Sequence, residues 1–312
     1  MYRITVRQHF GAARGAAAVL SFMVAAAGLV PEAATAQQVP TAAQAPTGAV
    51  GGMGDVNIYP KRIVIDDRRR LGTLGLYNRS TSPGDYDITL ADRLMTPAGQ
   101  LLDLDAVTDP ELRARSRSAA GMLRWSPRRA ALGGSEAQTV HVMARIAPDT
   151  APGEYRSHFM ILSVPPEGEG LSIDQAAGAA PADGIGVRIV PRFGISIPVI
   201  VRVGPTTLNV GIAGLAMIDG PQGRSLRLQL TREGTRSAFG DIAVTVPGTK
   251  TTVAEVMGVG VYTEVNGREV ILPLNPKADP RSYARGSRLT VTFTDDDAEP
   301  GKVLTRQELT VP

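Results

Sequence analysis

The segment from Ile185 to Val203 constrains the fold more than any other part of the chain. Apolar side chains occupy the odd positions from 187 to 201, with Pro191 as the exception, and this two-residue period is typical of a β-strand. Proline cannot donate a hydrogen bond to a neighbouring strand. Because Pro191 and Pro198 both lie inside the segment, we expect it to run at the edge of a sheet or to bend at the prolines. An apolar edge strand tends to recruit a further strand.

The same alternation recurs along the chain in short segments that are separated by turn residues, and 34 glycines and 23 prolines favour strands and turns over helices. Residues 108–119 are the one short helix we expect, with Pro110 in its first turn. Asn266-Gly267 predicts a tight hairpin within 259–274, and 289–294 with 303–311 predict a final hairpin. The sequence therefore predicts an all-β fold of two immunoglobulin-like β-sandwich domains in tandem, at 55–203 and 204–312.

The N-terminus has the order of a secretory signal peptide. Arg3, Arg7 and Arg14 form a basic first segment, an apolar run from Ala16 to Val30 follows, and the small residues Ala34-Thr35-Ala36 come after it. We predict a signal peptide at 1–36, a flexible leader at 37–54, and an exported product without a stable membrane span after cleavage. An uncleaved membrane anchor is the alternative.

Composition narrows the possible functions. The chain has no cysteine, which excludes thiol chemistry, and its net charge is only +3, so we expect no nucleic-acid partner. Ser196 does not lie in a G-x-S-x-G motif, because Pro198 stands where the last glycine would be. Asp295–Asp297 are interpreted as a polar hairpin tip rather than a calcium site. We expect no enzyme activity, no cofactor and no metal.

Several segments, in a fixed order, resemble the N-terminal domain of the periplasmic pilus-assembly chaperones that work with an outer-membrane usher. These segments are Tyr59–Val64 with Arg62, Leu76–Asn78, Trp125-Ser126-Pro127 followed by Gly133-Gly134 and Gln138–Val140, Arg156–Pro166, and Ile197–Arg202. The resemblance covers roughly residues 55–203. It implies a periplasmic location and, as partners, pilin-like subunits together with an outer-membrane usher.

The mechanism of that family implies which residues would bind a subunit. A family chaperone inserts its own edge strand into the hydrophobic groove of an incomplete subunit, supplying backbone hydrogen bonds and alternating apolar side chains. The corresponding side chains here are Val187, Ile189, Phe193 and Ile195. The alternative is that these side chains face the core of their own domain.

In the family, an arginine and a lysine bind the subunit's C-terminal carboxylate. Arg62 stands at the arginine position, with Arg192 as the nearest cation in the last strand. Pro198 stands at the lysine position, and no lysine occurs between Lys61 and Lys250. The resemblance therefore predicts a divergent chaperone in which strand donation is the better preserved function.

Two other functions remain open from the sequence. A structural or adhesive immunoglobulin-like surface protein would use the edge strand to pair with copies of itself. A polysaccharide-binding module would need an aromatic platform, which a chain with one tryptophan and 4% aromatic residues hardly provides.

Overall fold

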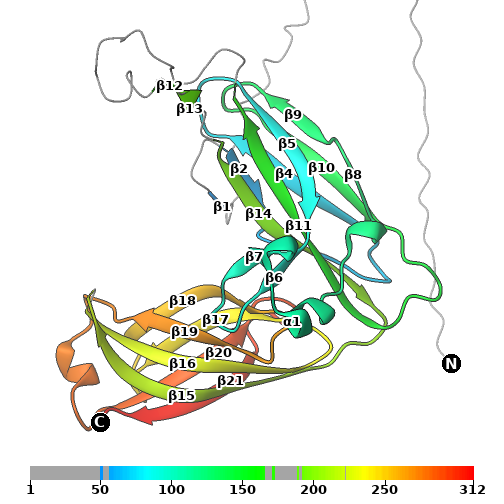
Figure 1. Cartoon of the computed structure of the whole chain (residues 1–312). Helices are drawn as coiled ribbons and strands as arrows, with labels where there is room; N and C mark the ends of the chain where they lie inside the picture. The colour runs from blue at the N-terminus through cyan, green and yellow to red at the C-terminus, as the bar shows by residue number, and fades with distance from the viewer. Residues whose placement is uncertain (1–49, 52–55, 166–170, 173–187, 190–191, 222) are drawn as a thin grey trace, which may run out of the picture. The chain divides into compact units, whose positions relative to one another are not determined.

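The computed structural model describes residues 50–51, 56–165, 171–172, 188–189, 192–221 and 223–312, which lie in one compact unit. The predicted signal peptide and most of the predicted leader lie outside the described residues. The regular secondary structure of the described residues is nearly all β-strand and forms two immunoglobulin-like sandwiches, which confirms the predicted fold class (Figure 1). Among these residues, no helix is long and apolar enough to cross a membrane.

The N-terminal sandwich has two sheets of five strands each. The first sheet has the order β1 (Val50–Gly51), β2 (Val56–Tyr59), β4 (Leu71–Asn78), β10 (Ala137–Ala144), β8 (Leu123–Ser126). The second has the order β3 (Ile63–Ile65), β14 (Gly194–Val203), β11 (Gly153–Val164), β5 (Gly84–Ala91), β9 (Arg129–Leu132). Two pairs of short strands are also present: β6 (Arg93–Met95) with β7 (Leu101–Asp103), and β12 (Leu171–Ser172) with β13 (Arg188–Ile189). The short helices of this sandwich are η1 (Leu104–Ala106), α1 (Pro110–Ala114) and η2 (Ala120–Met122).

The core of this sandwich follows from the two-residue period. In β14 the odd positions from Ile195 to Val203 are all buried, and in β10 the buried positions are Val140, Val142 and Ala144. Side chains from both sheets therefore meet in one cluster. Each buried aliphatic side chain contributes about 1.5–3 kcal/mol to the free energy of unfolding.

The opening strand divides at Pro60 and serves both sheets. Its first part, β2, pairs antiparallel with β4, and its second part, β3, pairs parallel with β14. Proline lacks the N–H that would continue the first ladder, so the chain leaves one sheet here and enters the other. Arg62 lies in the connection between the two parts.

The C-terminal sandwich contains seven strands in two sheets. One has the order β15 (Leu208–Gly220), β16 (Gly223–Gly234), β19 (Gly267–Pro273), and the other β18 (Thr252–Val261), β17 (Ala238–Thr245), β20 (Arg288–Asp295), β21 (Val303–Thr310), with η3 (Pro280–Tyr283) before β20. Among the described residues, no sheet combines strands from both sides of Gly204. The exact domain limits at 203 and 204 stay a prediction.

The hairpin predicted at Asn266-Gly267 is wrong. β18 pairs with β17 and β19 pairs with β16, so residues 262–266 cross from one sheet to the other instead of turning back. Tyr262 and Val265 on this crossing are buried in the C-terminal core, which holds the connection between the layers. The final hairpin, β20 with β21, is confirmed.

The helix predicted at 108–119 is shorter than expected. It begins as predicted, because Asp109 caps it by accepting hydrogen bonds from the backbone N–H groups of Glu111 and Leu112. It ends at Ala114, and the chain then becomes extended. There the Arg117 carbonyl accepts a hydrogen bond from the backbone of Arg156, at 2.8 Å, in place of a helical partner.

Candidate partner-binding site

The N-terminal half of β14 has an unpaired edge. β11 pairs with β14 along its whole length from Gly194 to Val203, but β3 covers the other side only at Val199–Val201. Gly194–Pro198 therefore have no strand partner on that side among the described residues. Their unused backbone groups can receive an additional strand.

The four predicted donor side chains differ in their positions. Ile195 is 7% exposed and packs in the N-terminal core, so its prediction as a donated side chain is wrong. Phe193 is 42% exposed, although both its N–H and its carbonyl oxygen bond to Ser163. Val187 lies outside the described residues, and for Ile189 only the strand pairing of β13 with β12 is described.

The register of β3 places Arg62 at the end of this free edge. Ile63 is level with Val199 in a parallel pair, so the preceding residue, Arg62, lies beside the position of Pro198. The free edge from Gly194 to Pro198 is about 16 Å long at the usual strand rise. A strand that runs parallel to β14 on this edge would therefore end at Arg62.

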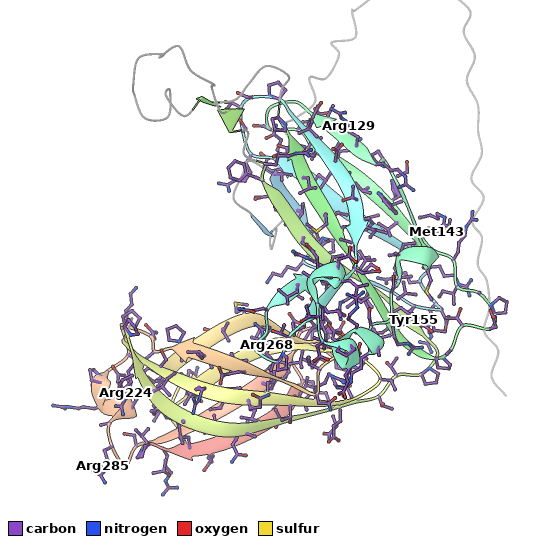
Figure 2. The ribbon with its side chains drawn as sticks, in the orientation of Figure 1. Arg129, Met143, Tyr155, Arg224, Arg268 and Arg285 are labelled. Atoms are coloured by element: carbon purple, nitrogen blue, oxygen red, sulfur yellow. The ribbon has the colours of Figure 1, made fainter. Side chains whose placement is uncertain are left out.

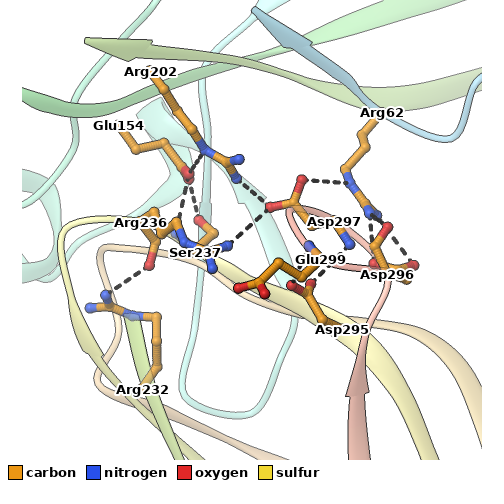
Figure 3. Close-up of polar contacts among 10 residues, drawn as sticks. All are labelled: Arg62, Glu154, Arg202, Arg232, Arg236, Ser237, Asp295, Asp296, Asp297 and Glu299. Carbon is orange, nitrogen blue, oxygen red and sulfur yellow. Dashed lines mark hydrogen bonds and ion pairs between the residues drawn. The ribbon is translucent and has the colours of Figure 1, made fainter. Parts of the chain in front are cut away.

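Arg62 is engaged by the tip of the β20–β21 hairpin (Figure 3). Its Nη2 lies 2.6 Å from Oδ1 of Asp296 and its Nη1 lies 3.4 Å from Oδ2 of the same carboxylate. Nη2 also donates to the backbone carbonyl of Asp296, and Nε lies 3.9 Å from Asp297. The guanidinium carbon lies 4.5 Å from the centre of the Phe239 ring.

An open groove of about 1010 Å³ adjoins Arg62. Tyr59 and Leu71, which are 44% and 63% exposed, supply apolar surface to its lining. Lys61 and Arg69 also line the groove, and neither has an ion-pair partner among the described residues. The groove is therefore apolar and cationic, with an acidic wall formed by Asp296 and Asp297.

The two sandwiches meet on one end of the β11–β14 sheet. Glu154 on β11 is 1% exposed and accepts a hydrogen bond from Arg202 on β14 at 3.1 Å and bonds from Ser237 of the C-terminal sandwich. Arg202 also bonds to Asp297, which Arg236 approaches at 3.4 Å (Figure 3). Burial by itself would lower the pKa of Arg202, but the two carboxylates outweigh it and raise that pKa.

A second buried pair lies farther along β11. Arg156 and Glu264 are in contact at 2.6 Å, and Arg156 stacks over Tyr262 at 3.7 Å. His158, two residues on, is 1% exposed and has no hydrogen-bond partner for either ring nitrogen among the described residues. Burial, followed by the positive charges of Arg156 and Arg93, lowers the pKa of His158 to about 3.

The outer parts of the N-terminal sandwich carry isolated pairs. Arg129, labelled in Figure 2, pairs with Asp85 at 2.8 Å. Arg192 lies 3.6 Å from Asp87, and its Nε donates to the Ser163 carbonyl. Arg192 precedes Val199 by seven residues, about 23 Å along a strand, so the structure does not bring it to Arg62 and the proposed pairing of the two is wrong.

Sequence reasoning missed the partners of Arg62. Asp295–Asp297 do lie at a hairpin tip, as interpreted from the sequence. However, the tip also forms ion pairs with the N-terminal sandwich, through Arg62 and Arg202. Glu154, Arg202 and Asp297 are separated by tens of residues, and no periodicity links them. The signal that the sequence offers is the run of three consecutive aspartates, Asp295–Asp297.

Comparisons with known proteins give a likeness in structure only. No protein-family model matches the chain, and no curated protein matches it. The CupB2 chaperone of Pseudomonas aeruginosa is similar with a TM-score of 0.40 at 12% identity, over 82% of this chain and all (100%) of that one. The E. coli chaperone DraB gives 0.39 at 11% identity over 82% of this chain and 96% of that one.

A complex is also among the similar structures. The Salmonella enterica SafA pilin in complex with the SafB chaperone is similar with a TM-score of 0.38 at 12% identity, over 84% of this chain and 98% of that one. All three scores lie below 0.5. The likeness therefore assigns no function to this chain.

Proposed function

We propose that the protein is a periplasmic chaperone that binds pilin-like subunits by adding one of its strands to them and passes them on for assembly at an outer-membrane usher. The observation that carries this proposal is the unpaired edge of β14 at Gly194–Pro198, which leads directly to Arg62. An edge of this kind is the element that strand addition requires. The alternating apolar segment that continues before it, from 187 to 193, is the second requirement.

The geometry supports one direction for the bound strand. The free carboxylate of a partner is at its C-terminus. A C-terminal partner strand that places this carboxylate at Arg62 must therefore run along β14 from Gly194 toward Pro198. This direction is parallel to β14, as it is for β3, which begins where the partner strand would end. The free edge of β14 can pair with about five residues of the partner strand.

The side chains for the partner's groove come from before β14. Ile195 stays in the core of the chaperone, so the backbone of 194–198 supplies hydrogen bonds while Phe193 supplies apolar surface. Val187 and Ile189 would extend the same series. Burying a phenylalanine of this exposure contributes about 1–2 kcal/mol to binding.

Arg62 is proposed as the anchor of the partner's terminal carboxylate. A guanidinium can hold a carboxylate through two parallel hydrogen bonds, which fixes both its position and its orientation. The family's lysine is replaced by Pro198, and Lys61 and Arg69 at the groove supply positive charge near Arg62 instead. These cations would attract an acidic partner end.

Capture of candidate pilin subunits during periplasmic co-expression tests the proposal. Phe193→Asp should reduce the amount of subunit that co-purifies at least several-fold, because it places a charge in the subunit's apolar groove. Ile271→Asp is the matched control, since Ile271 is also exposed, at 51%, but lies on the C-terminal sandwich. Capture that is equal in the wild type and Phe193→Asp contradicts strand addition.

An adhesive protein that pairs with copies of itself is the second candidate, because the same free edge could pair with another copy. Sedimentation velocity separates the two. A chaperone remains monomeric without a subunit and forms a complex of one to one with it. Concentration-dependent assembly that Phe193→Asp abolishes, without capture of any subunit, favours the adhesive function.

A further inference from the structure

We propose that the Asp296 carboxylate occupies, in the free protein, the position on Arg62 that a partner's terminal carboxylate takes in the complex, so that binding exchanges one carboxylate for the other. The proposal rests on the proposed function, which supplies the partner and its carboxylate. It goes beyond that function because it assigns a role to a residue of the C-terminal sandwich.

The contact has the geometry of a bound carboxylate ligand. Both oxygens of Asp296 face both terminal nitrogens of Arg62, at 2.6 Å and 3.4 Å. The edge between the two terminal nitrogens is one of the two edges of a guanidinium that a two-point carboxylate ligand can use. A partner's carboxylate therefore cannot bind to the same edge of Arg62 while Asp296 remains there.

The three aspartates of the hairpin tip have separate roles. Asp295 is 2% exposed and accepts hydrogen bonds from the backbone N–H groups of Asp297 and Glu299, each at 2.9 Å, which shapes the turn. Asp297 joins Arg202 and Arg236, and it also lies 3.9 Å from Nε of Arg62. The Asp296 carboxylate contacts only Arg62 among the described residues, so it can leave without breaking the turn or the other ion pairs.

Exposure also favours exchange at Asp296. Both Asp296 and Asp297 line the open groove, but the Asp296 side chain is 26% exposed, against 5% for Asp297. A released Asp296 carboxylate can therefore return to water. Arg62 would keep its place, because its guanidinium rests on the buried ring of Phe239.

Exchange of one carboxylate for another leaves the charge of the Arg62 site unchanged. The apparent affinity of Arg62 for an external anion is its intrinsic affinity multiplied by the fraction of time during which Asp296 is not bound there. Isolated anions therefore bind more weakly to Arg62 than they would without Asp296. A subunit that also pairs with the β14 edge has additional binding energy with which to displace Asp296.

The test measures carboxylate binding at Arg62 directly, with sodium acetate as the probe and acetamide as its neutral counterpart. The Nε–H signal of Arg62 in the full chain, assigned from its loss in Arg62→Ala, is followed by NMR during the titration. Asp296→Asn and Asp296→Ser should each bind acetate about fivefold more tightly than the wild type, the change that loss of a competing pair of about 1 kcal/mol gives. Acetamide should bind to none of them.

Asp103→Asn is the matched control, because Asp103 forms a similar pair with Arg93 at 2.7 Å away from the groove. It should leave the acetate affinity at Arg62 at the wild-type value. Equal acetate affinity in the wild type and both Asp296 variants overturns the proposal.

The two proposals can fail separately. If the Asp296 variants bind acetate more tightly but no subunit is captured, the exchange stands and the chaperone function is wrong. If subunits are captured and acetate affinity does not respond to Asp296, the chaperone function stands and the exchange is wrong.

Discussion

Arg156 and Glu264 form a two-point ion pair between β11 and the chain crossing that follows β18. Nη2 lies 2.6 Å from Oε1 and Nη1 lies 3.0 Å from Oε2, and the side chains are only 6% and 2% exposed. Glu264 Oε1 also accepts the backbone N–H of Met95, at 2.7 Å. One buried carboxylate thus connects two segments of the N-terminal sandwich to the C-terminal sandwich.

Removal of one partner should be costly. Glu264→Leu leaves the Arg156 guanidinium buried without a counter-ion, so we expect the free energy of unfolding to fall by about 3–5 kcal/mol. The double variant Arg156→Met/Glu264→Leu should recover much of this loss, since no charge is then buried. Urea denaturation followed by circular dichroism measures both values.

An exposed pair provides the comparison for this prediction. Glu299 and Lys302 are in contact at 2.7 Å, but both side chains are more than half exposed. Glu299→Gln should therefore change stability by less than about 1 kcal/mol. A double variant that is less stable than Glu264→Leu alone would show that the Arg156–Glu264 pair is not the source of the effect.

His158 should make the protein acid-sensitive. Its folded-state pKa is lowered from 6.5 to about 3, so the unfolded chain binds a proton between these pH values and the folded chain does not. The contribution of His158 to stability is therefore fully present above about pH 6.5 and falls as the pH decreases toward 3, by about 1.4 kcal/mol per pH unit. His158→Leu should remove this part of the pH dependence.

Urea denaturation at pH 7 and pH 4.5 checks the prediction for His158. The loss of stability between the two pH values should be about 2–3 kcal/mol smaller in His158→Leu than in the wild type. His141, which is exposed on β10, supplies the control, because His141→Leu leaves His158 in place and should retain the acid sensitivity. An unchanged pH dependence in His158→Leu would mean that His158 can be protonated without unfolding.

The all-β plan was predictable because burial imposes a two-residue period that is visible in the sequence. Ile195 shows the limit of this reasoning. Its odd position was known, but periodicity does not tell whether the apolar face of a strand packs against the opposite sheet of its own domain or is free to bind a partner. The Asn266-Gly267 hairpin failed for a related reason, because the local turn preference was overridden by burial of Val265 in the core.

The candidate site was only partly predictable. Arg62 was chosen as a candidate from its place in an ordered series of motifs, and an edge position of β14 was expected from its prolines. Asp296 is 234 residues away from Arg62, and ion pairs between such distant residues depend on tertiary packing that no local pattern encodes. Arg192 was proposed because it is the nearest cation that precedes Pro198, the position of the family's lysine. The rise along the strand places it far from Arg62.

Asn78 should be essential for the turn region of the first sheet. Its side chain is fully buried and donates to the carbonyls of Ser82 and Gly133, at 2.8 Å and 3.0 Å, while its Oδ1 accepts from the Ser80 N–H. Asn78→Ala removes these three hydrogen bonds and leaves partly buried backbone groups without partners, so we expect a loss of about 1–3 kcal/mol in the free energy of unfolding. Asn209→Ala, at an exposed position of β15, should cost little in the same urea experiment.

Gly133 and Gly134 are adjacent and should respond differently to alanine. A Cβ at Gly134 would lie 2.1 Å from the backbone carbonyl oxygen of Thr81, which cannot move without displacing the neighbouring turn. A Cβ at Gly133 would meet only the flexible Glu136 carboxylate, at 3.1 Å. Gly134→Ala should therefore destabilise the protein by about 1–3 kcal/mol and Gly133→Ala by clearly less.

Thermal unfolding of the two glycine variants, compared with the wild type, decides this prediction. A lower melting temperature for Gly134→Ala alone is expected, because only this substitution forces the backbone apart. Equal losses in the two variants would instead indicate that the turn requires the conformational freedom of both glycines rather than the close approach of Thr81 to Gly134.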